Sequence, residues 1–417
     1  MSAPEPQRPF GEYQYEIYRA GLGGQAPELP IAPAAWEDCF RASVPAQAYD
    51  YIAGGAGSED TMRANLEAFR RRRLVPRMLR DVEARDLRVR LLGADLPAPL
   101  LLAPIGVQGI VHEEGELAPA RAASALGVPV VLSTAATRSI EEVAAACGDG
   151  PRWFQLYWSR DRDVIESLVG RAERAGYRAI VVTVDNQLLA WRPRDLATAY
   201  LPFLQGIGIA HYLTDPVFRA QLERPPEEDL PAAVGRWASI ATNPALDWDD
   251  LAFLRERTRL PILLKGILHP ADARRAVDAG LDGVVVSNHG GRQLDGAVAT
   301  LDALPAVVAA VPDGFPGLLD SGIRTGADIV KALALGARAV LGRPYVWGLG
   351  VAGEEGVRAV LRGLLADLDL TLALSGHRAV AELSPDVLAG QRSAARRILP
   401  VAVLGSSIAK STTRGYL

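Results

Sequence analysis

The sequence predicts an α/β protein built as a (β/α)8 TIM barrel, with an N-terminal helical extension and a long loop after the fourth strand. Short apolar runs recur eight times along the chain, and stretches with helical periodicity separate several of them. Several of these stretches end in glycine just before the next run, which is a usual signal for the end of a helix. Continuous apolar runs are typical of parallel strands that are buried on both faces. An open doubly wound sheet is the alternative architecture for the same pattern.

The expected strands are, in chain order, residues 99–104, 128–133, 152–157, 179–185, 261–266, 283–288, 317–320 and 339–342. Residues 1–95 precede them as a helical extension and cap, with a helical region over residues 33–53. Residues 96–385 form the expected barrel domain. Residues 386–417 form an arm that we expect on the surface or on a neighbouring subunit.

One connection is much longer than the others. Residues 186–250, after the fourth strand, are polar, rich in proline and expected to be irregular. A long loop after a barrel strand lies at the C-terminal mouth, so this one is a candidate lid or specificity loop. A simple surface excursion is the alternative, and the presence of Trp191, Arg192 and Arg194 in the first part of the loop favours the lid.

Composition excludes several classes of protein. Hydrophobic residues make up 49% and charged residues 23% of the 417, which excludes a disordered tail protein, a coiled coil or a collagen-like fibre. A formal net charge of −4 leaves no basic excess for phosphate backbones, so we expect no nucleic-acid partner. Two cysteines form no disulfide framework and favour a reducing compartment. Because no signal peptide, no peroxisomal terminus and no run of ~18–20 apolar residues is visible, we expect a cytoplasmic protein with no membrane partner.

The loop after the sixth strand, SNHGGRQLD at 287–295, holds the strongest candidates for chemistry. Polar residues at the C-terminal ends of barrel strands face the mouth. His289 is a candidate general base and Arg292 a clamp for a carboxylate, while Gly290 and Gly291 let the backbone approach a ligand. A loop histidine taken alone is more often structural than catalytic. The neighbouring Gly290, Gly291 and Arg292 favour a catalytic role for His289 instead.

Three other strands end in polar residues. Asp185 ends the fourth strand, where it can orient the imidazole of His289 or, equally, cap a helix or join a salt bridge. Lys265 ends the fifth strand and either meets an anion at the mouth or extends to solvent. Gln155 and Tyr157 end the third strand and can hydrogen-bond a ring system and a substrate oxygen, although core packing is the alternative for the tyrosine.

The last two strands are followed by a phosphate-site pattern. DSGIRTGAD at 320–328 and GRP at 342–344 each lead into a helix, and they place Arg324 and Arg343 beside backbone N–H groups. Phosphate here together with Lys265 fits a flavin mononucleotide, while a sugar-phosphate substrate would use the same cradle. The chain has no GxGxxG after a strand, no HExxH, no CxxC and no GxSxG, so we expect neither a Rossmann domain nor a metal nor a nucleophile elbow.

These motifs, from about residue 49 to 383, resemble the FMN-dependent L-2-hydroxy-acid oxidase and dehydrogenase family, which includes glycolate oxidase, lactate oxidase and mandelate dehydrogenase. The resemblance implies that FMN is the cofactor. The catalytic and substrate-binding residues that the resemblance implies are His289, Asp185, Arg292, Arg192, Lys265, Tyr157 and Tyr51, with Ala135 beside the substrate. The cofactor-binding residues that it implies are Pro104, Ile105, Gly106, Ser133, Gln155, Thr183, Lys265, Ser287, Asp320, Gly322, Arg324, Gly342 and Arg343.

Within the family, the strings GEYQYEIYRAGL, WRPRDL, PFLQG and YLTDPVF are similar to those of lactate 2-monooxygenases, which turn lactate into acetate, CO2 and water. The lid is shorter than that subfamily predicts, and RQLD is the oxidase form. The alternative is therefore a simple oxidase that releases the 2-oxo acid and H2O2. Ala135, where glycolate-oxidase-like members often have tryptophan, would then admit a bulkier acid.

Two further readings have less support. An FMN-dependent oxidase of peptides or natural products would not need both Arg192 and Arg292. A non-catalytic FMN-binding barrel would not need the acid–base set of His289, Asp185 and Lys265. The expected partners are therefore a small 2-hydroxy acid and O2. The resemblance also implies a homotetramer or homo-octamer.

Overall fold

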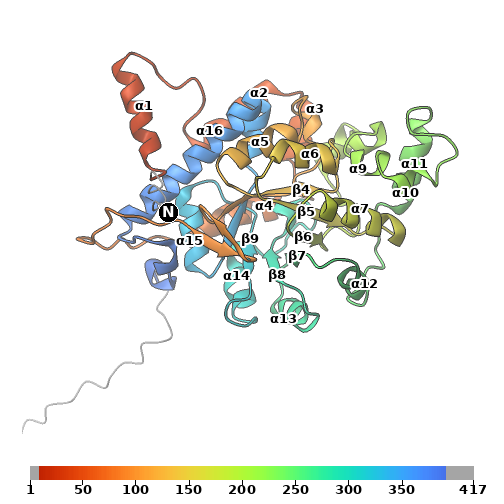
Figure 1. The fold of residues 1–417 in the computed structure, drawn as a ribbon. Coiled ribbons are helices and arrows are strands. Elements are labelled where there is room, and N and C mark those ends of the chain that lie inside the picture. Colours follow the sequence, from red (N-terminus) through yellow and green to blue (C-terminus); the bar gives the residue numbers. More distant parts are fainter. Residues whose placement is uncertain (1–8, 391–417) are drawn as a thin grey trace, which may run out of the picture.

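Strand β10 (Ala339–Gly342) pairs in parallel with β3 (Leu100–Leu102) on one side and with β9 (Gly317–Leu319) on the other, which closes the barrel. In this computed structural model, which describes residues 9–390, eight parallel strands follow one another around it (Figure 1). The other strands are β4 (Val130–Ser133), β5 (Arg152–Tyr157), β6 (Ile180–Thr183), β7 (Ile262–Ile267) and β8 (Gly283–Val286). Each lies within or overlaps an expected run, so the predicted TIM barrel is confirmed and an open sheet is excluded.

Helices cover the outside of the barrel and complete its α/β units (Figure 1). They are α5 (Leu117–Ala125), α6 (Ile140–Cys147), α7 (Arg162–Arg174), α12 (Asp250–Arg257), α13 (Pro270–Asp278), α14 (Thr300–Val308), α15 (Gly326–Ala334) and α16 (Tyr345–Leu374). Many begin with a side-chain cap, as at α6, where Ser139 and Glu142 form a reciprocal capping box. Short helical turns η1 (Gln108–Ile110) and η3 (His289–Gly291) follow β3 and β8 at the C-terminal end of the barrel.

The N-terminal extension contains α1 (Glu12–Leu22), α2 (Pro33–Ser43), α3 (Ala46–Ala53) and α4 (Asp60–Arg71). It also contains a β-hairpin that sequence analysis did not predict, formed by β1 (Val89–Leu91) and β2 (Ala94–Leu96). Leu91 and Leu96 pack on inward-facing residues of the barrel strands such as Trp153, and so they close its N-terminal end. Strands of three residues are too short to show a clear alternating pattern, which is why the hairpin was missed.

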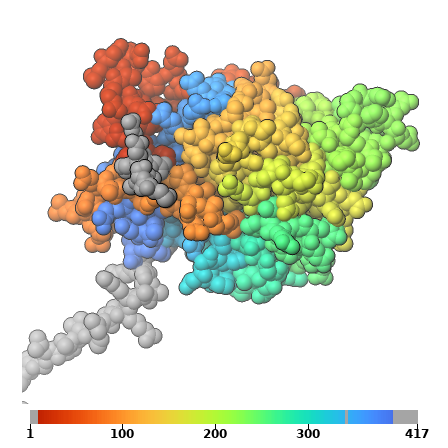
Figure 2. Space-filling model, in the orientation of Figure 1, coloured from red at the N-terminus to blue at the C-terminus, as the bar shows by residue number. Residues whose placement is uncertain are grey.

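The segment after β6 is not irregular, which corrects the expectation from composition. It folds into α8 (Pro193–Ala197), η2 (Pro202–Gln205), α9 (Ala210–Leu213), α10 (Pro216–Arg219) and α11 (Leu230–Ile240). Proline stands at the start of four of these short helices, where a missing N–H has no cost. The later ones form the green lobe at the right of Figures 1 and 2.

The two ends of the described chain differ in how they meet the barrel. Helix α1 buries no residue and projects from the body at the upper left of Figure 2. At the other end Leu388 forms an isolated bridge with Leu74, and Ala389 N donates to the carbonyl of Arg73. The rest of the expected C-terminal arm, residues 391–417, lies outside the described residues. Within residues 9–390, no helix has both the length and the hydropathy needed to cross a membrane.

Candidate active site

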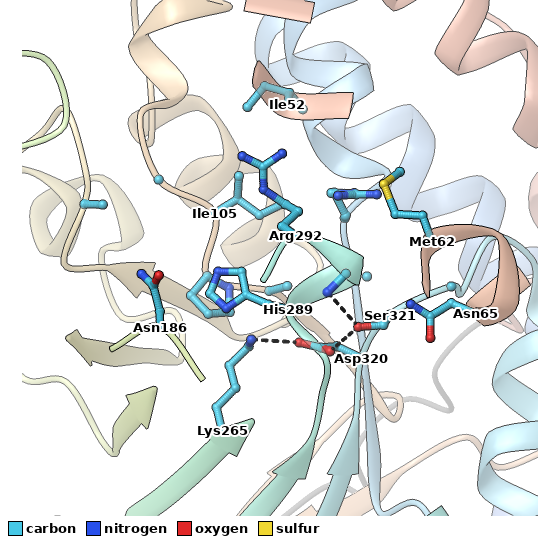
Figure 3. Close-up of a pocket in the computed structure, with 18 of the residues that line it drawn as sticks. Ile52, Met62, Asn65, Ile105, Asn186, Lys265, His289, Arg292, Asp320 and Ser321 are labelled. Carbon is cyan, nitrogen blue, oxygen red and sulfur yellow. Dashed lines mark hydrogen bonds and ion pairs between the residues drawn. The ribbon is translucent and has the colours of Figure 1, made fainter. Parts of the chain in front are cut away.

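A cavity opens at the C-terminal ends of the barrel strands, where the sequence places the candidate site. It brings together residues from α3 and α4, from β5, β7 and β10, and from the loops after β3, β4, β6, β8, β9 and β10 (Figure 3). The sequence-predicted residues that line it are Tyr51, Pro104, Ile105, Gly106, Ala135, Tyr157, Arg192, Lys265, His289, Arg292, Asp320, Gly322, Arg324, Gly342 and Arg343. One cavity therefore collects the candidate base, the candidate carboxylate clamp and the candidate phosphate cradle.

The remaining predicted residues are not part of this lining and lie at or near the C-terminal ends of β4, β5, β6 and β8. They are Ser133, Gln155, Thr183, Asp185 and Ser287. Ser133 Oγ donates to Gln155 Oε1 over 3.0 Å, which fixes the amide so that its Nε2 group faces away from this contact.

His289 and Asp185 form a close pair. His289 Nδ1 lies 2.7 Å from Asp185 Oδ1, so the network assigns the ring proton to Nδ1 and leaves Nε2 as an acceptor. Nε2 is 3.4 Å from the hydroxyl of Tyr157, whose ring stacks on the imidazole. Burial lowers the pKa of His289 below its usual value, although the carboxylate of Asp185 opposes the shift. This arrangement presents a neutral base at neutral pH.

Tyr157 is protonated over the same range, because burial raises its pKa to about 12. Its hydroxyl can therefore donate a hydrogen bond to an oxygen in the cavity. Tyr51, from the N-terminal extension, lies under the guanidinium of Arg292, with 5.2 Å from its ring centroid to Cζ. Both predicted tyrosines thus face the predicted arginine and histidine.

Two guanidinium groups converge above the histidine. Arg192, on the loop after β6, is buried, and its Nε donates to the carbonyl of Arg292 over 3.0 Å. Arg292 Nη1 donates to the carbonyl of Gly54. Burial, together with the nearby charge of Arg192, lowers the pKa of Arg292 to about 9, so Arg292 remains a cation at neutral pH. Paired cations in one cavity favour an anionic ligand such as a carboxylate.

Lys265 is almost fully buried at the end of β7 and does not extend to solvent. Its Nζ donates to Ser287 Oγ over 3.0 Å and lies 3.3 Å from Asp320 Oδ2 (Figure 3). Burial alone would lower the pKa of Lys265, but the carboxylates of Asp320 and Asp185 outweigh it and the pKa rises. A permanent positive charge therefore lies in the floor of the cavity.

The other end of the cavity is an anion cradle. Arg324 and Arg343 both line it, and burial with the charge of Arg324 lowers the pKa of Arg343 to about 10. Gly322 has φ of +100°, and a Cβ there would lie 2.9 Å from the carbonyl oxygen of Asn65. Two enclosed cations beside close-approaching backbone are typical of a phosphate site.

Three buried polar atoms near the cavity show whether its hydrogen-bonding groups suit a flavin. Gln155 Nε2, Thr183 Oγ1 and Arg343 Nη1 have no hydrogen-bond partner among the described residues. Leaving buried donors unpaired is costly, so such atoms indicate a bound group. Gln155 Nε2 and Thr183 Oγ1 lie on β5 and β6, and Arg343 Nη1 lies at the phosphate cradle. This arrangement suits a cofactor with a polar ring system at one end and a phosphate at the other. The donor set therefore fits FMN.

Several lining residues were missed by sequence analysis. They are Ile52, Met62, Asn65, Leu66, Ala103, Asn186, Leu189, Phe203, Ser321 and Ile323. Met62, Asn65 and Leu66 lie on α4, and no motif marks a helix of the extension as part of the site. Asn186 and Ser321 directly follow Asp185 and Asp320, so a search of one further residue at each strand end would have found them.

The fold and this cavity define a TIM-barrel protein in which a candidate base, a candidate carboxylate clamp and a candidate phosphate cradle share one cavity. Residues 40–390 match the family of FMN-dependent dehydrogenases. The chain is 46% identical over 384 residues to FMN-dependent alpha-hydroxy acid dehydrogenase qulF of Penicillium citrinum, covering 91% of this chain and 96% of that protein. It is 45% identical to an L-lactate oxidase of Lysinibacillus sphaericus, covering 88% and 95%.

Among solved structures, an active chimera of (S)-mandelate dehydrogenase is similar, with a TM-score of 0.79 and 38% identity over 87% of this chain and 99% of that one. The chain therefore belongs to the FMN-dependent dehydrogenase family. It is an FMN-dependent oxidoreductase of 2-hydroxy acids.

Proposed function

We propose that this protein oxidises an L-2-hydroxy acid with O2 as the electron acceptor, and that L-lactate is its substrate. The observation that carries the chemistry is the His289–Asp185 pair, which faces the same cavity as Arg192 and Arg292. The L-lactate oxidase and the human 2-hydroxyacid oxidase 1 among its relatives support an acid of this class and an oxidase.

Each residue then has a defined task. Arg192 and Arg292 hold the carboxylate, which fixes the 2-hydroxyl group toward His289. His289 Nε2 takes the hydroxyl proton, and Asp185 stabilises the imidazolium that forms. Tyr157 donates a hydrogen bond to the substrate oxygen as its charge develops.

FMN, when bound, would accept the hydrogen on C2 of the substrate together with its electron pair, as a hydride, while the hydroxyl proton goes to His289. Ser133, Gln155, Thr183 and Ser287 would contact its ring, and Arg324 with Arg343 would hold its phosphate. Lys265 would place a positive charge beside the ring, where a negative charge develops on reduction. Pro104 to Gly106 would form the wall against the ring, because they line the same cavity.

The finer proposal is a lactate 2-monooxygenase reaction, in which lactate and O2 give acetate, CO2 and water. Decarboxylation inside the site requires that the 2-oxo acid be retained. The segment that bears Arg192 is tied to the N-terminal cap, since Arg194 Nη2 lies 2.6 Å from Glu59 Oε2 and Gly57 N donates to the carbonyl of Trp191. A lid fixed in this way favours retention.

A second candidate function is supported by the wall of the cavity. The small side chain of Ala135 lines the cavity together with the apolar side chains of Leu189 and Phe203, a composition that suits a bulkier apolar group on the acid. A mandelate oxidase is among the similar structures, with a TM-score of 0.75 and 41% identity. On this alternative the protein releases a bulkier 2-oxo acid together with H2O2.

Product analysis separates the two. The holoenzyme is mixed with L-lactate in air-saturated buffer containing catalase, and acetate and pyruvate are measured. Catalase destroys any released peroxide before it reacts with pyruvate in solution, so acetate made under these conditions was made in the site. Acetate equal to the lactate consumed supports the monooxygenase, pyruvate supports the oxidase, and no turnover of lactate overturns the substrate assignment.

A further inference from the structure

The backbone of the candidate base is held in an unusual conformation. His289 has φ of +57°, in the left-handed region that non-glycine residues rarely adopt. Such a residue persists only where its surroundings determine the conformation. Here the N–H groups of three successive residues each meet a side-chain oxygen: His289 N meets Ser287 Oγ at 3.0 Å, Gly290 N meets Ser321 Oγ at 3.0 Å, and Gly291 N meets Asn288 Oδ1 at 3.2 Å.

Asn288 is in turn fixed by a residue outside the barrel. Asn65 Nδ2 donates to Asn288 Oδ1 over 2.9 Å, and Asn288 Nδ2 donates back to Asn65 Oδ1 over 2.8 Å. Both side chains are buried, with 2% and 5% of their surface exposed. Asn65 Oδ1 also accepts from Thr300 N, and Asn288 Nδ2 also donates to the carbonyl of Val298. Both side-chain oxygens and both amide groups of the pair therefore have partners, and these contacts fix one orientation of each amide.

Helix α4 supports the same loop at two more points. Asp295 Oδ1 accepts from Thr61 N over 3.0 Å, at the start of the helix. Gly291 has φ of +76°, and a Cβ there would lie 2.7 Å from the backbone nitrogen of Met62. The loop that bears the base therefore rests on α4 at several points, and Asn65 contacts Asn288, the residue next to His289.

We propose that Asn65 is a positioning residue for His289, acting through Asn288. The proposal rests on the function proposed above, because it takes His289 as the base. Asn65 fixes the amide of Asn288, the amide fixes Gly291 N, and the turn keeps the imidazole in line with Asp185. A misplacement of about 1 Å in a reacting group can lower a rate about 100-fold, so a support of this kind affects the rate rather than substrate binding.

The test uses the FMN-bound protein and the substitution Asn65→Asp, which keeps the shape but removes both Nδ2 hydrogens. A carboxylate oxygen would then face Asn288 Oδ1. Asn65→Ser is the second variant, because it removes the contact without adding a charge and so remains informative if Asn65→Asp does not fold. Asn243→Asp, in the loop before α12, is the matched control, since its Oδ1 accepts from Ala245 N within the same loop.

Two readouts distinguish positioning from a general structural role. Hydrogen exchange at the amides of Gly290 and Gly291 should become at least about 10-fold faster in both Asn65 variants. Anaerobic flavin reduction by L-lactate should slow about 10- to 100-fold, while the Kd for lactate changes less than about threefold and FMN remains bound. The Asn243 variant should match the wild type in both.

Unchanged exchange and an unchanged reduction rate in a folded Asn65 variant would overturn the proposal. The proposal would also be overturned if the reduction rate falls only in proportion to the amount of FMN that the variant has lost. If lactate and other L-2-hydroxy acids fail to reduce the wild-type flavin, the proposed function fails instead. The exchange measurement uses no substrate, so it would still test the contact between Asn65 and the loop.

Discussion

The Nε group of Arg192 donates to the carbonyl oxygen of Arg292 over 3.0 Å, so one guanidinium of the cavity is held by the backbone of the residue that carries the other. One arginine comes from the loop after β6 and the other from the loop after β8. This contact links the position of the proposed lid to the geometry of the proposed carboxylate clamp. It also keeps two like charges together, which is favourable only when an anion lies between them.

Replacing Arg292 with lysine keeps a positive charge but removes the planar fork that binds a carboxylate through two hydrogen bonds. We expect Arg292→Lys to raise the Kd for L-lactate at least about tenfold, which corresponds to about 1.4 kcal/mol. The flavin should remain bound, because the phosphate cradle is untouched. Titration of the flavin absorbance with a non-reacting carboxylate analogue measures this Kd. An unchanged Kd would mean that Arg292 does not hold the carboxylate.

The pH dependence of flavin reduction reports the base. The groups facing His289 are Asp185, which raises its pKa, and Lys265 and Arg192, which lower it, with burial as the largest cause and a net downward shift. The neutral imidazole is the active form, so the rate should be lost as pH falls through a midpoint below 6.5 and should be level from there to about pH 8. Stopped-flow reduction from pH 5 to 8 checks this. A midpoint above 7 would contradict the assignment.

Arg343 tests the cofactor end of the cavity. Its Nη1 has no partner among the described residues, and its pKa is lowered to about 10 because it is a buried cation beside Arg324. We expect Arg343→Gln to weaken FMN binding at least about tenfold and to reduce the rise in Tm on adding FMN. Arg338→Gln is the control, because Arg338 is exposed on the segment before β10. Equal FMN affinity in the two variants would exclude Arg343 from the phosphate site.

Arg194 tests retention by the lid. It joins the lid to the cap through Glu59 at 2.6 Å and Asp50 at 3.8 Å. If acetate is the product of the wild type, Arg194→Leu should shift part of the turnover to pyruvate and H2O2, because an unfastened lid releases the 2-oxo acid earlier. Arg219→Leu breaks a salt bridge with Glu227 that lies within the lid, so it should leave the product ratio unchanged. Equal ratios in both variants would mean that this ion pair does not govern retention.

The barrel could be predicted because its strands are buried on both faces. Runs such as 179–185 and 283–288 are mostly apolar, and the polar residues at or just after their ends, such as Asp185 and His289, lie at the C-terminal mouth of the barrel. His289, Asp185 and Lys265 were found for this reason, since position at a strand end assigns them to one place. Strand order in a parallel barrel follows chain order, so distant strand ends meet without any further information.

The contributions of the extension and the lid could not be predicted in the same way. Asn65 lies in the middle of an amphipathic helix, and nothing in its sequence neighbourhood shows that its amide faces Asn288 more than two hundred residues later. The strands of the hairpin at Leu91 and Leu96 are too short to show an alternation of apolar and polar residues. The lid helices, at four to eleven residues, are likewise too short to show a clear helical periodicity. Their placement depends on tertiary contacts, which local patterns do not contain.

The most direct test of the central claim is an anaerobic one. The purified protein with bound FMN is mixed with L-lactate in the absence of oxygen, and the visible absorption of the flavin is followed, with D-lactate as the control. We predict that L-lactate bleaches the flavin and that D-lactate does not. The arginine clamp fixes the carboxylate, so the 2-hydroxyl group of only one enantiomer faces His289. A flavin that remains oxidised with L-lactate and with bulkier L-2-hydroxy acids such as L-mandelate would contradict the assignment of this cavity.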